Sequence, residues 1–175
     1  PDNVAIVLGI AEAVGVDYET ALQGMLNAPA DPGAVRIKYF HANNTQNVFV
    51  NAFAANEPKS TKAILNKVES YNYPYKKKII ILNCRSDRID RTQLFVENFL
   101  EDVDYDVLIC TGKSTQMVSN LMQKMPDKKY LNYEGQEFSE IEKGIMHESE
   151  NALVFCVGNI HGPGGRIAEF IEGIE

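Results

Sequence analysis

The sequence has few cysteines, fewer positive than negative charges and no long apolar run. Each of these features argues against a class of binding or a kind of site. The chain has 17 Lys and Arg against 24 Asp and Glu, a formal net charge of −7, which argues against nonspecific binding to nucleic acid. It contains neither a signal peptide nor an apolar run of membrane-spanning length, so we expect no direct membrane insertion. The three cysteines, Cys84, Cys110 and Cys156, form no C-x-x-C pair and no metal-ligand spacing with histidine. We expect reduced thiols in the core of a cytosolic protein, with a catalytic or ligand role as the weaker alternative.

A length of 175 residues suits one α/β domain with a sizeable core, or one domain and a remnant of another. The chain begins without Met, at the start of a predicted helix, which suggests a segment of a longer protein. Residues 28–33 (APADPG) hold two prolines and a glycine, the best linker signal in the chain. We therefore expect a boundary between residues 1–33 and residues 34–175.

Before this linker the pattern predicts two helices. The first, over 4–14, is apolar almost all round and should be buried on more than one side. The second begins after Asp17, a suitable N-cap. After the linker we expect strands over 35–40, 48–54, 78–83, 106–111, 129–133 and 152–157. We expect helices over 92–100, 114–125 and 166–171, and one that begins within 56–61. A further helix, with a Ser139/Glu142 capping box, should end near residue 148. This alternation predicts an α/β fold, a Rossmann-like, mostly parallel sheet with helices on both faces.

The strongest local signal is a charged loop after a buried strand. The apolar run Ile79–Leu82 stops at Asn83 and reads as a strand buried on both faces. Three arginines and two aspartates follow, at the strand end where α/β folds bind ligands: Arg85, Asp87, Arg88, Asp90 and Arg91. The aspartates can balance two guanidiniums, and an oxyanion ligand could balance the third. A solvated loop with internal ion pairs is an equally good interpretation.

Three further loops, over 51–61, 111–115 and 158–166, would meet the charged loop at one edge of a parallel sheet. Gly112-Lys113-Ser114-Thr115 is similar to the end of a phosphate-binding P-loop, but the glycine required five residues earlier is Val107. We therefore reject a P-loop. What remains is a helix start beside Lys113, which could hold an anion.

The loop over 158–166 has four glycines and two side chains able to bind a ligand, Asn159 and His161, without dinucleotide-binding spacing. A tight turn without ligand is the alternative. Asn56 can cap the next helix, which leaves Asn51 as an unexplained polar residue in an apolar strand. The other histidines, His41 and His147, are expected to be surface or structural residues.

Several motifs in this order resemble one family. They are Asn3, Gly24-Met25, Asp31-Pro32-Gly33-Ala34 with Arg36, NAFAANEPKST over 51–61, NCRSDRIDR over 83–91 and GNIHGPGG over 158–165. Together they resemble the CapB-type poly-γ-glutamate synthases of capsule synthesis, relatives of the Mur ligases and folylpolyglutamate synthases, across essentially the whole chain. The resemblance implies that residues 1–33 are helices from the end of a central ATPase domain. Residues 34–175 would be the C-terminal domain.

The resemblance also implies an ATP-dependent amide ligase, in which ATP activates a glutamate γ-carboxylate as an acyl phosphate and the amine of the next glutamate attacks it. ATP and Mg²⁺ would be held mainly by an upstream part. The implied partners are glutamate, the growing poly-γ-glutamate and other subunits of a membrane capsule-synthesis complex, linked to virulence. The implied location is the cytoplasmic face of the bacterial membrane, reached through those partners.

By the same resemblance, Arg36 corresponds to an arginine near the interdomain linker. Asn56 corresponds to the asparagine of an Asn-Pro segment near the nucleotide. The loop over 85–91 would bind glutamate carboxylates or phosphate. Without a P-loop, this segment alone is expected to be inactive. The alternative function is a non-catalytic α/β module that binds an anion or docks a partner of the capsule complex. A free-standing dinucleotide enzyme is disfavoured because no dinucleotide fingerprint is present.

Overall fold

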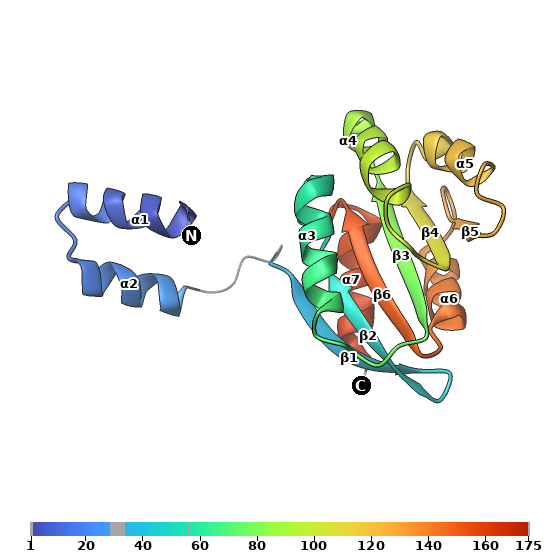
Figure 1. Cartoon of the computed structure of the whole chain (residues 1–175), viewed down its shortest axis with the longest axis horizontal. Coiled ribbons are helices and arrows are strands. Elements are labelled where there is room, and N and C mark those ends of the chain that lie inside the picture. The colour runs from blue at the N-terminus through green and yellow to red at the C-terminus, as the bar shows by residue number, and fades with distance from the viewer. Residues whose placement is uncertain (1, 29–33, 56, 175) are drawn as a thin grey trace. The chain divides into compact units, whose positions relative to one another are not determined.

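A computed structural model of the chain describes residues 2–28, 34–55 and 57–174 (Figure 1). The chain divides into two compact units, Pro1–Pro32 and Gly33–Glu175, and each is described by itself. None of the described helices is both long and apolar enough to cross a membrane.

The first unit consists of two helices, α1 (Asp2–Ala13) and α2 (Tyr18–Asn27). Asp17 caps α2 as predicted, because its Oδ1 accepts a hydrogen bond from the Thr20 amide at 3.0 Å. The burial predicted for the first helix is not found. Ile6 and Ile10 of α1 are 60% and 58% exposed, because a single helical neighbour can cover only one side of a helix that is apolar all round.

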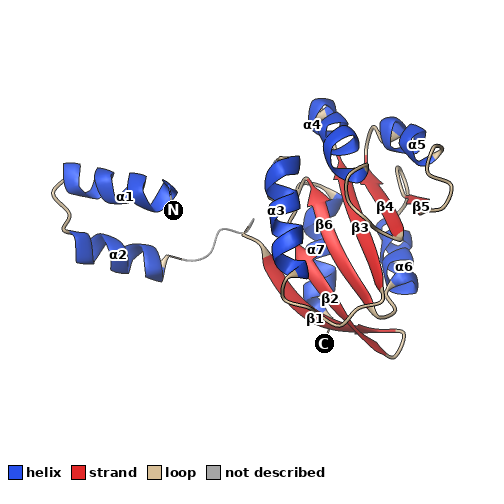
Figure 2. Ribbon diagram, viewed as in Figure 1, coloured by secondary structure: helices blue, strands red, loops and turns tan. Residues whose placement is uncertain are grey.

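The second unit is built, in its described residues, on a six-stranded sheet of order β1-β2-β6-β3-β4-β5 (Figure 2). The strands are β1 (Arg36–Ala42), β2 (Thr45–Asn51), β3 (Lys77–Cys84), β4 (Val107–Gly112), β5 (Lys129–Asn132) and β6 (Ala152–Gly158). All neighbours pair in parallel except β1, which forms an antiparallel hairpin with β2. The predicted α/β fold with a mostly parallel sheet is confirmed.

Helices cover both faces of this sheet. On one face lie α3 (Pro58–Glu69), α4 (Ile89–Phe95) with its π-helical continuation η1 (Val96–Leu100), and α5 (Gln116–Met122), which share one apolar cluster. On the other lie α6 (Phe138–Glu148) and α7 (Pro163–Gly173), which share a second cluster. The run Ile79–Leu82 explains why two clusters exist. Ile80 and Leu82 belong to the first, and Ile79 and Ile81 to the second, as alternation along a strand requires.

Several predicted boundaries differ from the structure. The helix predicted over 92–100 begins at Ile89, and the one predicted over 166–171 begins at Pro163, where proline suits a first turn. The predicted capping box is wrong. Glu137 is the N-cap of α6 and makes no side-chain cap bond, so Ser139 lies inside the helix.

Candidate functional site

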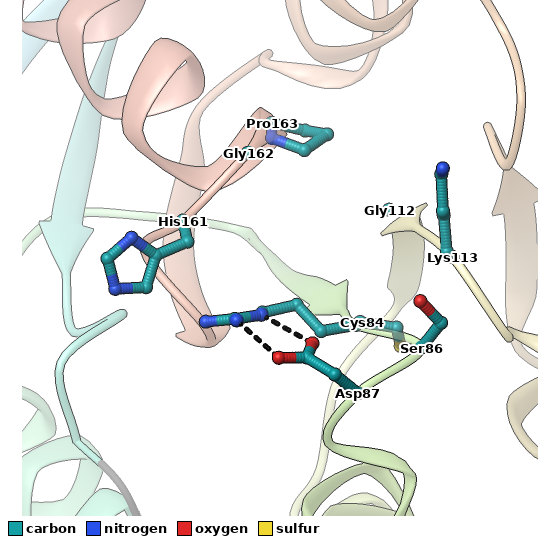
Figure 3. Close-up of a pocket in the computed structure, with 9 residues that line it drawn as sticks. Cys84, Ser86, Asp87, Gly112, Lys113, His161, Gly162 and Pro163 are labelled. Atoms are coloured by element: carbon teal, nitrogen blue, oxygen red, sulfur yellow. Dashed lines mark hydrogen bonds and ion pairs between the residues drawn. The ribbon is translucent and has the colours of Figure 1, made fainter.

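Three strand-end loops meet around a pocket of about 250 Å³ (Figure 3). They follow β3, β4 and β6, whose ends lie level because Asn83 pairs with Thr111 on one side and Gly158 on the other. The pocket is lined by Cys84, Arg85, Ser86, Asp87, Gly112, Lys113, His161, Gly162 and Pro163. The predicted meeting of loops at one edge is thus confirmed for these three.

The buried side chain of Asn83 joins the three loops. Its Nδ2 donates hydrogen bonds to the carbonyl oxygens of Asn159 at 2.5 Å and His161 at 2.8 Å. Its Oδ1 accepts a bond from the Thr111 hydroxyl at 3.2 Å. From the sequence, Asn83 was placed at the end of an apolar run and within the motif NCRSDRIDR, but not among the predicted site residues. An amide directly after a buried strand was the available signal, since a buried amide needs partners.

The charges of the pocket are only partly balanced within it. Arg85 forms a two-pronged pair with Asp87, from Nε at 2.9 Å and Nη2 at 2.6 Å, and this bond lowers the pKa of the Asp87 carboxyl. The exposed Lys113 ammonium forms no direct salt bridge among the described residues, although its charge contributes to the lowered pKa of the Glu134 carboxyl. His161 and Lys113 stand on opposite sides of the opening (Figure 3). The pocket therefore offers an anion one cation and one imidazole.

The other charged residues of this loop do not line the pocket. Arg88 is the N-cap residue of α4 and Asp90 lies in its first turn, and neither lines the pocket. Arg91 donates to Oδ1 of Asn159 at 2.9 Å. Of the two Arg–Asp pairs expected there, the described residues contain one, Arg85–Asp87. Arg91 is held by an amide instead.

Arg36 and Asn51 do not line the pocket. They are cross-strand partners in β1 and β2, and both contact Glu172 of α7. The Arg36 Nη1 lies 3.0 Å from one carboxylate oxygen, and the Asn51 Nδ2 lies 3.3 Å from the other. Glu172 thus accounts for the polar Asn51 in an apolar strand without a ligand. Asn56 lies outside the described residues.

The predicted anion site at the start of α5 is already filled by Glu134. Its carboxylate accepts hydrogen bonds from the backbone amides of Ser114 at 2.6 Å and Thr115 at 3.1 Å, and from the Thr115 hydroxyl at 2.6 Å. These bonds lower the pKa of the Glu134 carboxyl. The expectation that these amides serve a bound anion is therefore wrong, and only the Lys113 side chain remains available.

Replacing Glu134 by alanine should lower the free energy of unfolding at pH 7 by about 1–2 kcal/mol, the typical value of a lost helix cap. Because the folded state lowers this pKa, the stabilisation is present above the ordinary value of 4.5 and is lost as pH falls through the folded value. Urea unfolding at neutral and acidic pH measures both effects. Glu140→Ala, which removes an exposed carboxylate of α6, is the control. An unchanged deficit in acid would contradict a role for the charge.

Metal binding does not fit the described residues on their own. Among them no group of three or more His, Cys, Asp or Glu could hold a metal ion. The only carboxylate that lines the pocket, Asp87, is bonded to Arg85.

Solved structures define the class of fold. The chain is similar to a folylpolyglutamate synthase from Thermotoga maritima, with a TM-score of 0.53 and 18% identity over 98% of this chain and 38% of that one. It is also similar to MurF from Acinetobacter baumannii, with a TM-score of 0.56 and 14% identity over 93% of this chain and 35% of that one. At these identities the likeness shows the fold alone, an α/β domain like those in such ligases.

The family itself follows from closer relatives. The model of the poly-gamma-glutamate synthase CapB C-terminal domain matches residues 37–174, and the chain belongs to this family. It is 40% identical to the capsule biosynthesis protein CapB of Bacillus anthracis, over 98% of this chain and 37% of that protein. It is also 40% identical to the PGA synthase CapB of Bacillus subtilis (strain 168), over 98% and 44%. The chain thus spans about two fifths of these relatives, and the predicted resemblance is confirmed.

Proposed function

We propose that this chain is the C-terminal part of an ATP-dependent ligase that joins glutamates through γ-amide bonds into poly-γ-glutamate. Residues 1–33 would come from the end of a central ATPase domain. The name of the family and that of the Bacillus subtilis relative, PGA synthase, support the product. The observation that supports the site is the pocket, which the exposed Lys113 ammonium lines without a direct salt bridge among the described residues. Glutamate, its polymer and ATP all carry the anionic groups that such a cation binds.

The domain would act by closing over the reactants and positioning one of them. ATP, when bound mainly by an upstream part together with Mg²⁺, supplies activation of a γ-carboxylate. The Lys113 ammonium donates a charge-assisted hydrogen bond to a carboxylate or phosphate oxygen, worth roughly 1.5–3 kcal/mol. The His161 imidazole offers a hydrogen bond from the opposite side. Asn83 holds both loops in place, which gives the positioning its precision. The nearby Arg88, Asp90 and Arg91 would shape the approach to the pocket.

Lys113→Met in the complete synthase should raise the KM for one reactant by roughly 10- to 100-fold, the loss of one charge-assisted bond. Steady-state kinetics with glutamate and ATP varied in turn identifies the reactant. Lys124→Met removes an exposed cation that does not line this pocket and is the matched control. Equal kinetic constants in both variants would refute anion binding by Lys113. They would favour the alternative, a non-catalytic module that docks other subunits of a membrane capsule complex.

The 175-residue chain alone should neither hydrolyse ATP nor form amide bonds, because residue 107, where a P-loop needs glycine, is a valine inside β4. Phosphate release and polymer formation are measured with the purified chain and the complete synthase side by side. Turnover by the chain alone, above that of a mock preparation, would contradict this part of the proposal.

A further inference from the structure

Two of the three cysteines touch beneath the pocket. Cys84 is the last residue of β3, and Cys110 lies in the adjacent strand β4. Their side chains lie on the same face of the sheet, within one apolar cluster, and their sulfur atoms are 3.7 Å apart. Cys156 of β6 belongs to the cluster on the opposite face. The molecule therefore contains a pair of thiols and a separate single thiol.

Of the two cysteines, Cys84 is part of the pocket lining and is itself only 2% exposed. It lies between the loops that carry Asp87 and Lys113 (Figure 3). Cys110 does not line it and is fully buried behind Cys84. We expect a small reagent in the pocket to reach the Cys84 sulfur when the end of β3 moves, with the Cys110 sulfur 3.7 Å from it.

The surroundings of the two thiols also shift their pKa values in opposite directions. The hydrogen bond with Cys110, and then one with Thr92, lowers the pKa of the Cys84 thiol despite its burial. The same contact and burial raise the pKa of the Cys110 thiol, and burial alone raises that of Cys156. Because the thiolate is the reactive form, and because Cys84 lines the pocket whereas Cys110 and Cys156 do not, we expect Cys84 to react first.

We propose that Cys84 and Cys110 form a dithiol modification site, which a small hydroperoxide entering through the pocket oxidises to an intramolecular disulfide. The Cys84 thiolate attacks one peroxide oxygen. A sulfur–oxygen bond forms, the oxygen–oxygen bond breaks, and the other oxygen leaves with a proton as water or an alcohol. The Cys110 sulfur then attacks the Cys84 sulfur. The sulfur–sulfur bond forms, and hydroxide leaves as water with the Cys110 proton.

The strand end can supply the movement that this bond needs. A disulfide is about 2.05 Å long, so the two sulfurs must approach by about 1.7 Å. Cys110 lies inside its strand, whereas β3 ends at Cys84 and continues into the exposed segment Ser86–Asp90. We expect the Cys84 side to move. This inference concerns thiol chemistry alone and holds whether or not the proposed ligase function is correct.

The test uses the full 175-residue chain, reduced and then freed of reductant. Folded protein is treated with hydrogen peroxide, quenched with N-ethylmaleimide in denaturant, and analysed by mass spectrometry without reduction. The expected product is a monomer lighter by about 2 Da before alkylation, through loss of two hydrogens. After alkylation this monomer carries one maleimide, on Cys156. Its peptides include a pair in which Cys84 is bonded to Cys110. Dithiothreitol should restore three alkylated cysteines.

Alanine variants separate the steps, and circular dichroism checks that each is folded. Cys110→Ala should stop at a Cys84 sulfenic acid, which dimedone traps. Cys84→Ala should leave both remaining thiols free, and the control Cys156→Ala should still form the disulfide. In the unmodified chain Cys84 should react at least ~10-fold faster than Cys156. Three free thiols after oxidation, a disulfide that involves Cys156, or Cys84 oxidised to sulfinic acid while Cys110 stays free would each overturn the proposal.

Discussion

Asn83→Ala should lower the free energy of unfolding by about 2–5 kcal/mol. The substitution removes the donor that binds the carbonyl oxygens of Asn159 and His161, and the acceptor of the Thr111 hydroxyl. The bonds with Asn159 and Thr111 are buried and the bond with His161 is partly buried. A buried polar group left without a partner costs roughly 1–3 kcal/mol. Urea unfolding of the 175-residue chain, monitored by circular dichroism, measures the loss.

Two further variants make this measurement specific. Asn120→Ala removes an exposed amide on α5 whose side chain bonds, among the described residues, to its helical neighbour Gln116. It should change stability by less than about 0.5 kcal/mol. Asn83→Asp keeps the size of the side chain but replaces the donating NH₂ by a carboxylate oxygen, which would face two carbonyl oxygens. It should cost at least as much as Asn83→Ala. If Asn83→Ala proved as mild as Asn120→Ala, Asn83 would not hold the loops.

The fold was predictable from local sequence because its strands are buried on both faces. A run such as Ile79–Leu82 is apolar at every position, and this signal needs no knowledge of the neighbouring strands. The parallel arrangement followed from the alternation of strands and helices. The order of the strands does not follow from such patterns. It is the central position of β6 between β2 and β3 that brings the loop with His161 beside the loop with Arg85.

The site was predictable only in part, because partners distant in sequence decide which polar groups remain available. Lys113, Arg85 and His161 were predicted and do line the pocket. Arg36 was predicted from the family resemblance and Asn51 as a polar residue in an apolar strand, yet both contact Glu172 on the last helix. Glu134 occupies the amides of Ser114 and Thr115 from 20 and 19 residues away. No local pattern reveals such pairings, since each depends on the packing of complete elements.

Gly112→Ala should be as harmful as the loss of Asn83, for a steric reason. Gly112 ends β4 with φ of +90°, and a Cβ there would lie 2.0 Å from the carbonyl oxygen of Cys84. The left-handed conformation alone costs an alanine about 1–2 kcal/mol. Overpacking against the backbone of β3 adds typically 1–3 kcal/mol. The expected total is about 2–5 kcal/mol in the free energy of unfolding.

Two other glycines separate the conformational cost from the steric one. Gly135 and Gly162 also have positive φ, of +73° and +69°, but a Cβ at either position meets no atom within 4 Å. Gly135→Ala and Gly162→Ala should therefore show only the conformational part, and urea unfolding of all three variants gives the difference. Gly162 and Gly112 both line the pocket, so in the complete synthase Gly112→Ala should lower activity more than Gly162→Ala does. Equal losses of stability in the three variants would mean that β3 and β4 do not need this close approach, and that the pocket tolerates a shift of the loop that carries Lys113.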